Sequence, residues 1–291
     1  MTDENLNMFN RKTIYGILFG LLAAGLILAG IIFYSKSQKL KVVFLNVGQG
    51  DAILISQGSN QILIDGGKSG QILLEKLGKY ISFWDRKIET IVITHPDQDH
   101  IGGFADVFKS YKIETVVKTN AASSSKTFEF LSNDINSEGS EIVEAKKGVR
   151  ISFPNGAEMD LIFPSSSVSE NEKDTNSQSV VSVLKIGNYK FLFTGDLTAE
   201  KEEEISQKGF DISADVLKVA HHGSKYSTGE EFLKKVSPQE AIISVGKNSY
   251  GHPAEETLEK LRSIGTKILR TDETGDIIYK CRLPNEECQR K

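Results

Sequence analysis

All five histidines of the chain lie just after runs of apolar, mostly β-branched residues, and this placement strongly constrains the fold. Short apolar runs bounded by glycine and turn residues are typical of buried strands. We therefore expect the imidazoles at strand ends, gathered at one edge of the fold to build a single site. The five are His95, His100, His221, His222 and His252.

The segment HPDQDH, residues 95–100, carries the most chemistry. It directly follows the buried-strand pattern TIVIT and holds four metal-capable side chains: His95, Asp97, Asp99 and His100. Imidazoles and carboxylates together suit divalent metals, and a pair of ions can activate a water molecule. A polar surface turn is the alternative interpretation, but turns rarely concentrate charged and imidazole groups in this way. We interpret the segment as part of a metal site.

Three further segments repeat the pattern of a strand followed by polar residues. They read ILIDGG at 62–67, FLFTGD at 191–196 and VAHHGS at 219–224, and they contribute Asp65 and Asp196. An aspartate after a strand is by itself more often a helix cap. The segments belong to two successive blocks, each passing from paired strands into alternating strands and helices. That order is compatible with an α/β fold of two sheets face to face with helices outside, although periodicity alone does not distinguish it from other α/β layouts.

Composition excludes some classes of protein. The net charge of −4 argues against a nucleic-acid binder with a broad basic surface, although bound metal ions would reverse the charge locally. The two cysteines, Cys281 and Cys288, form no CxxC motif, so a thiolate zinc site is unsupported. They are either unrelated thiols or, in a domain outside the cytoplasm, the halves of a disulfide.

The stretch Ile14–Tyr34 contains no charged residue and is long enough to cross a hydrocarbon core of roughly 30 Å. It predicts an uncleaved membrane anchor. A buried core helix and a cleaved signal peptide are the alternatives. We place a short polar linker at 35–39. The chain then divides into residues 1–40, a cytoplasmic tail, transmembrane anchor and linker, and residues 41–291, the domain that carries these motifs.

Basic residues flank both ends of this stretch, so the positive-inside rule does not orient it. A short N-terminal tail before a long C-terminal domain is the usual layout of a signal anchor. We therefore expect a single-pass protein of the cell membrane whose domain lies outside the cytoplasm.

The motifs taken together resemble a known family. The order Asp-Gly-Gly, HxDxDH, Gly-Asp, His-His-Gly is similar to the metallo-β-lactamase superfamily, which implies its αββα sandwich after the single transmembrane helix. NVGQGDA at 46–52, THPDQDHIGG, FTGDL, VAHHGS and YGHP resemble the ComEC-type branch, the hydrolase domain of DNA-uptake proteins. The resemblance covers roughly residues 41–280.

Residue by residue, the resemblance implies a site with two divalent ions, zinc or manganese. His95 and Asp97 match ligands of the first ion, and Asp99 and His100 match ligands of the second. Asp196 matches the carboxylate that bridges them. His221 matches the distal ligand, although His222 could exchange roles with it, and Asp65 matches the residue that orients the cluster. Since Asp97 stands where most members have histidine, the site is richer in carboxylates and is expected to accept Mn²⁺ more readily than a three-histidine zinc site.

The resemblance also implies hydrolysis of an ester-type bond, with DNA as the substrate. We assign catalytic roles to Asp99, His222 and His252. Candidate substrate-binding residues are Lys225, Lys247, Asn176 and Ser179, the last two falling where most members place a further histidine. For each lysine the alternative is a solvated surface charge.

Three alternatives to this function stay open at this point. The substrate could be a lactone or a small phosphodiester, since fold does not fix substrate. A non-catalytic, membrane-tethered metal-binding module is the third, although such a site should be closed by four ligands. A DNA-uptake protein needs several membrane helices, so a membrane channel is a candidate partner.

Overall fold

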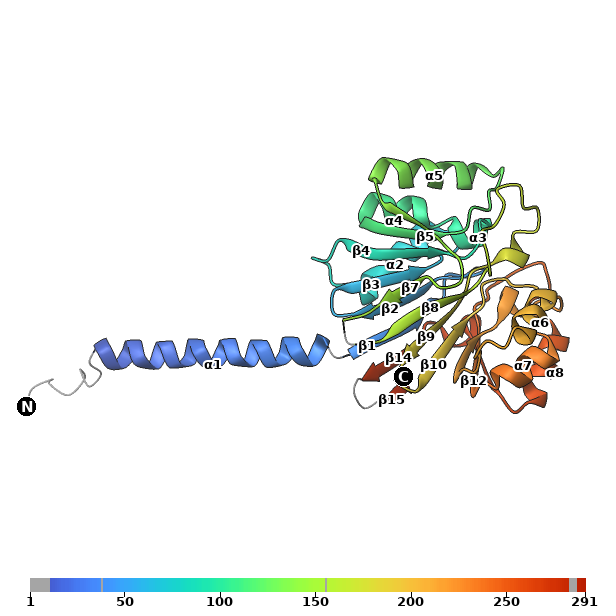
Figure 1. Cartoon of the computed structure of the whole chain (residues 1–291). Helices are drawn as coiled ribbons and strands as arrows, with labels where there is room; N and C mark the ends of the chain where they lie inside the picture. The colour runs from blue at the N-terminus through green and yellow to red at the C-terminus, as the bar shows by residue number, and fades with distance from the viewer. Residues whose placement is uncertain (1–10, 38, 155, 283–286) are drawn as a thin grey trace, which may run out of the picture.

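The computed structural model describes residues 11–37, 39–154, 156–282 and 287–291. Two β-sheets lie face to face, and helices cover the outer face of each sheet (Figure 1). This arrangement confirms the predicted αββα sandwich. One long helix projects away from the sandwich at the N-terminal side.

The first sheet is built mainly from the N-terminal half of the chain. Its outer face is covered by α2 (Gly70–Tyr80), α4 (Phe104–Ser110) and α5 (Lys126–Glu138). In the described residues its strands follow the order β15 (Glu287–Arg290), β14 (Ile277–Arg282), β1 (Lys39–Phe44), β2 (Ile53–Gln57), β3 (Asn60–Ile64), β4 (Lys87–Ile93), β5 (Lys112–Lys118) and β6 (Glu141–Glu144).

The second sheet comes from the C-terminal half. Helices α6 (Ala199–Gln207), α7 (Glu230–Val236) and α8 (Glu255–Ser263) cover its outer face, and a short α9 (Thr271–Thr274) follows its edge strand. The described strands follow the order β13 (Lys267–Arg270), β12 (Glu240–Ile243), β11 (Val216–Lys218), β10 (Tyr189–Phe193), β9 (Val181–Ile186), β8 (Glu158–Phe163) and β7 (Arg150–Ser152).

Alternation of side chains along each strand separates the layers. On β1, Val42 and Phe44 enter the core between the sheets, whereas Val43 points toward the helices on the outer face. The inner core is rich in aromatic rings, and the ring centroids of Phe44 and Tyr279 lie 6.1 Å apart. On α2, Leu73 and Leu77 lie four residues apart and are both buried, as expected for an amphipathic helix.

The parallel strands position the site. In the first sheet β3, β4, β5 and β6 run parallel, and in the second β10, β11, β12 and β13 do so. In open α/β sheets, ligands bind outside the carboxyl ends of parallel strands. The loops after β3, β4, β10 and β11 carry the predicted polar residues, and they meet at one edge of the sandwich.

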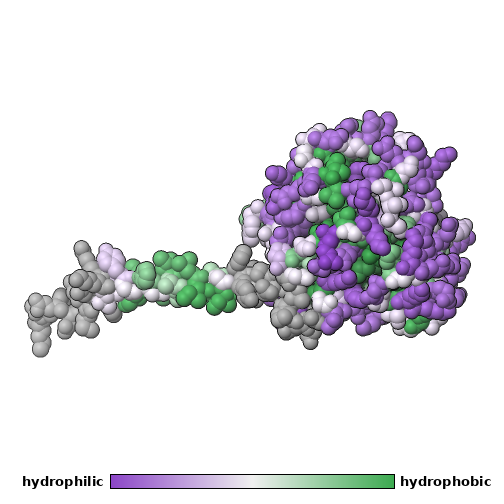
Figure 2. All heavy atoms as spheres, viewed as in Figure 1, coloured by the Kyte–Doolittle hydropathy of each residue, from purple (hydrophilic) through white to green (hydrophobic). Residues whose placement is uncertain are grey.

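Helix α1 (Arg11–Ser37) is longer than the apolar stretch that predicted it, because it continues through residues expected to form a linker. The linker prediction at 35–39 was therefore wrong: helix reaches Ser37, and β1 begins at Lys39. Residues 13–31 are long and apolar enough to cross a membrane, and none of that span is buried. Figure 2 shows α1 as an apolar rod beside a largely hydrophilic domain. This excludes the buried core helix. The predicted tail at 1–10 lies outside the described residues.

The two cysteines form a disulfide. Cys281 on β14 and Cys288 on β15 are directly opposite in the antiparallel pair, and their sulfur atoms are bonded. The alternative of two unrelated thiols is thereby excluded.

Candidate metal centre

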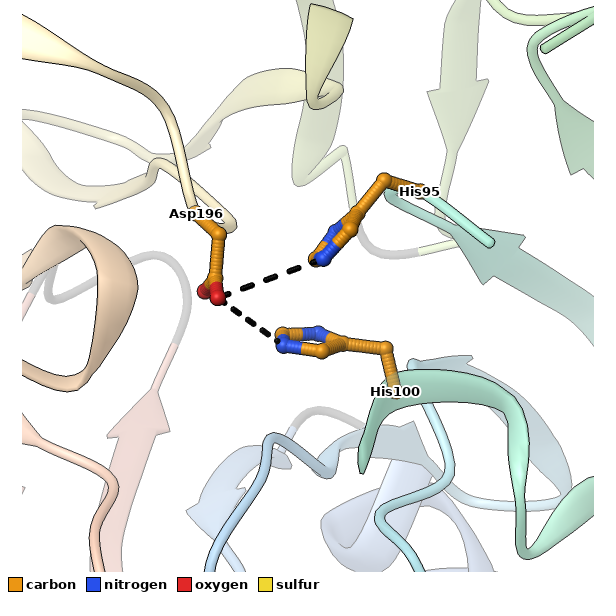
Figure 3. A group of neighbouring side chains, drawn as sticks. All are labelled: His95, His100 and Asp196. Carbon is orange, nitrogen blue, oxygen red and sulfur yellow. Dashed lines mark ion pairs between the residues drawn. The ribbon is translucent and has the colours of Figure 1, made fainter. Parts of the chain in front are cut away.

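His100 lies at the middle of the site, held from behind by Asp65. A carboxylate oxygen of Asp65 lies 2.8 Å from His100 Nδ1. Because a carboxylate accepts, Nδ1 carries the proton, and Nε2 is left facing Asp196 Oδ2 at 3.3 Å (Figure 3). Asp65 itself is fully buried and adopts a left-handed backbone conformation with φ of 56°. A residue other than glycine adopts the left-handed conformation only where its surroundings enforce it, which is common at functional sites.

His95 is also oriented by the Asp65 carboxylate, through the hydroxyl of Thr94. The Thr94 hydroxyl donates to Asp65 at 2.6 Å and lies 3.0 Å from His95 Nδ1, so the hydroxyl oxygen accepts from the ring. His95 Nε2 then points into the site, 3.9 Å from Asp196 Oδ2 (Figure 3). Asp65 thus fixes the protonation state and direction of two imidazoles at once.

His222 enters from the opposite sheet, on a 3₁₀ turn (η2, Ala220–Gly223) after β11. Its Nδ1 lies 2.8 Å from the backbone carbonyl of Ser244, which fixes the ring. Its Nε2 lies 3.4 Å from carboxylate oxygens of both Asp99 and Asp196. His221 is partly exposed instead, with Nε2 3.8 Å from Asp196. Of the two adjacent histidines, His222 is therefore the buried and anchored one.

The buried donor atoms fit a metal ion. Nε2 of His95, His100 and His222 and one oxygen each of Asp51 and Asp196 are buried without a hydrogen-bond partner. An unpartnered buried polar atom costs about 1–3 kcal/mol, so five at one place require an explanation. In the described residues, ligand atoms lie within 4.8 Å of one another in the groups His95–His100–Asp196, Asp99–His100–His222, Asp51–Asp196–His222 and Asp51–Asp65–His100. This donor set of imidazoles and carboxylates suits divalent cations.

The pKa values of the buried histidines diverge, according to whether burial or the carboxylates dominate. Burial, together with the neighbouring His100, lowers the pKa of His95 to about 3. Burial also opposes the charged form of His222, but Asp196, Asp51 and Asp99 outweigh it and raise the pKa of His222 to about 9. The carboxylates therefore stabilise the protonated, positively charged form of the His222 ring.

Two residues of the site were missed from the sequence. Lys218 is fully buried, forms an ion pair with Asp51, donates to the Gly195 carbonyl at 2.9 Å and lies 3.7 Å from Asp196. Although burial disfavours the ammonium, Asp51 and Asp196 raise the pKa of Lys218. A lysine inside the apolar run DVLKV was the available signal for it. For Asp51 the available signal was the glycine-rich loop that precedes it. The structure explains the glycine at position 50, since a Cβ on Gly50 would collide with the Asp99 carbonyl.

An open cavity of about 160 Å³ lies over the cluster. Of the predicted catalytic residues it brings together Asp99, His222 and His252, the last with its ring 5.3 Å from that of His221. Sequence reasoning missed two lining residues, Gln49 and Tyr250. The full lining is Gln49, Asp97, Asp99, Asp196, His221, His222, Tyr250 and His252.

The four predicted substrate-binding residues are not among those that line this cavity. Lys225 and Lys247 are exposed, and the Lys225 ammonium lies over the ring of Tyr226. Ser179 is fully buried, and its hydroxyl accepts from the Asp196 backbone N–H at 3.2 Å, which supports that loop. Asn176 begins a 3₁₀ turn, η1 (Asn176–Gln178), and its side-chain oxygen is buried without a partner.

Asp97 differs from the other predicted ligands because it is half exposed. It precedes the short helix α3 (Gln98–Ile101), and one oxygen accepts from the Thr175 hydroxyl at 3.0 Å. The other lies 3.9 Å from His95 Nε2. Burial raises the pKa of Asp97, and Thr175 opposes this. Asp97 therefore lies at the rim of the cluster beside His95.

The fold and this site define the class. The model of the metallo-β-lactamase superfamily matches residues 45–247, and the chain belongs to that superfamily, whose fold binds divalent metals. The chain is 33% identical over 267 residues to ComE operon protein 3 of Bacillus subtilis, covering 86% of this chain and 34% of that protein. It is 29% identical to competence protein ComA of Neisseria gonorrhoeae, covering 88% of this chain and 35% of that protein. The chain thus spans about a third of these relatives.

Solved structures agree on the fold at low sequence identity. The metallo-β-lactamase fold protein YhfI of Bacillus subtilis superposes with a TM-score of 0.55 at 10% identity, covering 84% of this chain and 99% of that one. Zn²⁺-bound PqqB of Methylobacterium extorquens gives a TM-score of 0.50 at 10% identity, covering 76% and 85%.

Proposed function

We propose that the chain is a membrane-anchored, metal-dependent phosphodiesterase that hydrolyses DNA. The observation that carries the proposal is the set of unpartnered Nε2 atoms of His95, His100 and His222 around Asp196, beneath an open cavity. A structural metal site would be closed by its ligands. The DNA substrate is supported by the names of the relatives, which are competence proteins.

We propose that the side chains around Asp196 would hold two divalent ions, zinc or manganese. His95 and Asp97 would hold one ion, and Asp99 and His100 the other. The sequence assigned the distal ligand to His221; we now propose His222, because its Nε2 is buried, anchored and close to Asp99. Bound divalent ions supply a Lewis acid that lowers the pKa of water and neutralises charge on a phosphate oxygen.

The chain's own residues complete the reaction. We assign proton transfer to Asp99, whose carboxylate lines the cavity and lies beside His222, which stabilises its ionised form. His221 and His252 face the same space, and burial lowers the pKa of both rings. Neutral imidazoles donate one hydrogen bond each, so we propose that these two orient the substrate phosphate.

We further propose that α1 spans the membrane and that residues 41–291 form the hydrolase domain outside the cytoplasm, after a membrane-anchoring segment at 1–40. The Cys281–Cys288 disulfide supports this placement, since such bonds persist in oxidising compartments. A membrane channel is the proposed partner, in keeping with the competence-related names of the relatives.

Purified full-length chain, stripped of metal and reconstituted with Mn²⁺ or Zn²⁺, tests the activity. We expect turnover of a bis-aryl phosphodiester and degradation of DNA, with Mn²⁺ at least as effective as Zn²⁺. Aryl esters and lactones serve as the competing substrates. Turnover of a lactone without cleavage of any phosphodiester would overturn the proposed substrate, and activity with Zn²⁺ alone would overturn the preference for manganese.

A further inference from the structure

A second and larger cavity, of about 640 Å³, lies at the other end of β1 from the metal centre. Five cationic side chains line it, and none of them forms an ion pair with a side chain that the structure describes. Among the described side chains, no Asp or Glu lines it. The five are Lys39, Lys41, Lys280, Arg282 and Lys291, and we call them the basic cluster.

Strand register explains the concentration of charge. In the antiparallel pair of β1 and β14, Lys39 is opposite Arg282 and Lys41 is opposite Lys280. Directly opposed side chains on one sheet face have Cβ atoms about 4.5–5.5 Å apart, and like charges there are destabilising. The chain nevertheless places two such pairs side by side. An anion bound between them would turn this repulsion into attraction.

The floor of the cavity is polar and unpartnered. Ser56 is opposite Lys41 across β1 and β2, and Gln61 is opposite Ser56 across β2 and β3. Both side chains are more than nine-tenths buried, and Ser56 Oγ and Gln61 Oε1 have no hydrogen-bond partner. Asp85 accepts from the Gln61 amide nitrogen at 2.9 Å, so the carbonyl oxygen is left to accept from a ligand. The site therefore offers cations for a negative group and an acceptor for a hydroxyl.

The cavity also lies close to the membrane anchor along the chain. Lys39 follows the last residue of α1 by two positions, and two residues span at most about 7 Å. With α1 across a bilayer, Lys39 would lie close to the lipid headgroups, and the rest of the basic cluster lines the same cavity as Lys39. Each lysine near an anionic bilayer contributes roughly 1 kcal/mol of attraction.

We propose that this cavity binds the headgroup of an anionic phospholipid that combines a phosphodiester with free hydroxyls, as phosphatidylglycerol does. The inference rests on the proposed membrane anchoring by α1. The basic cluster meets the phosphate, while Ser56 and Gln61 meet the headgroup hydroxyls. The bound lipid would then fix how the domain sits on the membrane.

Native mass spectrometry of the detergent-solubilised full chain tests the proposal with dioctanoyl phosphatidylglycerol, dioctanoyl phosphatidylcholine, inorganic phosphate and a short single-stranded DNA. We expect phosphatidylglycerol to bind at least about tenfold more tightly than phosphatidylcholine. The double variant Lys41→Gln/Lys280→Gln should weaken it by roughly 10- to 30-fold, at about 1 kcal/mol for each lysine. The control Lys126→Gln/Lys173→Gln removes the same charge from exposed positions elsewhere and should bind as the parent does.

Equal binding of the two lipids overturns the proposal, as does equal loss in both double variants. Inorganic phosphate or DNA overturns the lipid headgroup as the ligand of this cavity if it binds as tightly as phosphatidylglycerol and its binding is lost in Lys41→Gln/Lys280→Gln but kept in the control, because binding at the metal centre would not depend on these lysines. The short-chain lipid is water-soluble and reaches the cavity from solution, so this experiment does not depend on insertion of α1. Alkaline extraction of membranes tests the anchoring separately, and release of the chain there would overturn the anchor alone.

Discussion

The two cavities of this protein lie toward opposite ends of β1 and have opposite chemistry. One gathers carboxylates and imidazoles around Asp196, and the other gathers ammonium and guanidinium groups around Lys41 and Lys280. In both cavities some buried polar atoms have no hydrogen-bond partner. In both, like charges lie close together, although their repulsion destabilises the folded state. The small net charge of −4 conceals this separation completely. Local charge, and not the total, indicates what each end of the domain binds.

The largest effect is expected from Asp196→Asn. This isosteric change removes the charge that faces the Nε2 atoms of His95, His100, His221 and His222 at 3.3–3.9 Å. We expect both metal content and phosphodiester turnover to fall, the latter by more than ~10³-fold, because metal-ion catalysis supplies several kcal/mol. Elemental analysis and steady-state kinetics measure the two. Glu129→Gln, an exposed carboxylate on α5, is the control. Full metal content in Asp196→Asn would contradict the shared-ligand role.

His252→Ala should have the next largest effect and a different signature. The ring lines the cavity beside His221, and within the described residues no ion pair joins it to Asp196, whereas the other four histidines each have Nε2 within 3.9 Å of that carboxylate. Loss of one positioned donor to developing charge costs ~10²–10³-fold in turnover. The variant should therefore lose rate and keep its metal. Metal loss comparable to that of Asp196→Asn would make His252 a ligand and move the boundary between the metal centre and the substrate space.

Asp65→Asn should weaken metal binding by ~10–100-fold, as expected when the partner that orients a ligand is altered. The amide can still occupy the same space but no longer holds Thr94 and the His100 Nδ1 proton with a full charge. A competitive chelator titration gives the affinity, and Asp211→Asn, at an exposed carboxylate that forms an ion pair with Lys190 away from the cluster, is the control. Unchanged affinity would show that the imidazoles are oriented without it.

The smallest effect should appear at the other cavity and have the opposite sign. Lys41→Gln removes one of two directly opposed ammonium groups, so it should stabilise the domain by ~0.2–1 kcal/mol. Chemical denaturation without added lipid measures the free energy of unfolding. A loss of stability would mean that Lys41 has a favourable structural role and that the basic cluster is not strained by its own charge.

The sequence predicted well whatever depends on local pattern. The histidines lie in segments that follow β4, β11 and β12, because apolar runs and glycines mark the ends of those strands reliably. The direction of a side chain is harder to foresee. Lys225 and Lys247 occupy loops near the site yet are not among the residues lining its cavity, and Ser179 turns inward to hold the Asp196 loop.

Contacts between distant segments could not be predicted where no motif marks the residues. Lys218 meets Asp51 only after the two sheets pack, and either residue alone resembles an ordinary strand or loop residue. The basic cluster likewise depends on the register of β1 against β14, which brings Lys41 opposite Lys280. A one-residue slip would send these side chains to the other face. Long-range pairing, which no single segment encodes, decides both cavities.

The short connection between α1 and β1 limits how far the metal centre can lie from the membrane under the proposed anchoring. Fourteen residues at most about 3.6 Å long separate Ser37 from Asp51, so the reacting centre stays within about 50 Å of the bilayer surface under the proposed anchoring. Molecules diffusing beyond that layer are out of reach however tightly the cavity would bind them. Anything delivered across or along the membrane, in contrast, is met at a high effective concentration. Turnover in the cell would then depend on the supply of substrate to this layer more than on its amount in the surroundings.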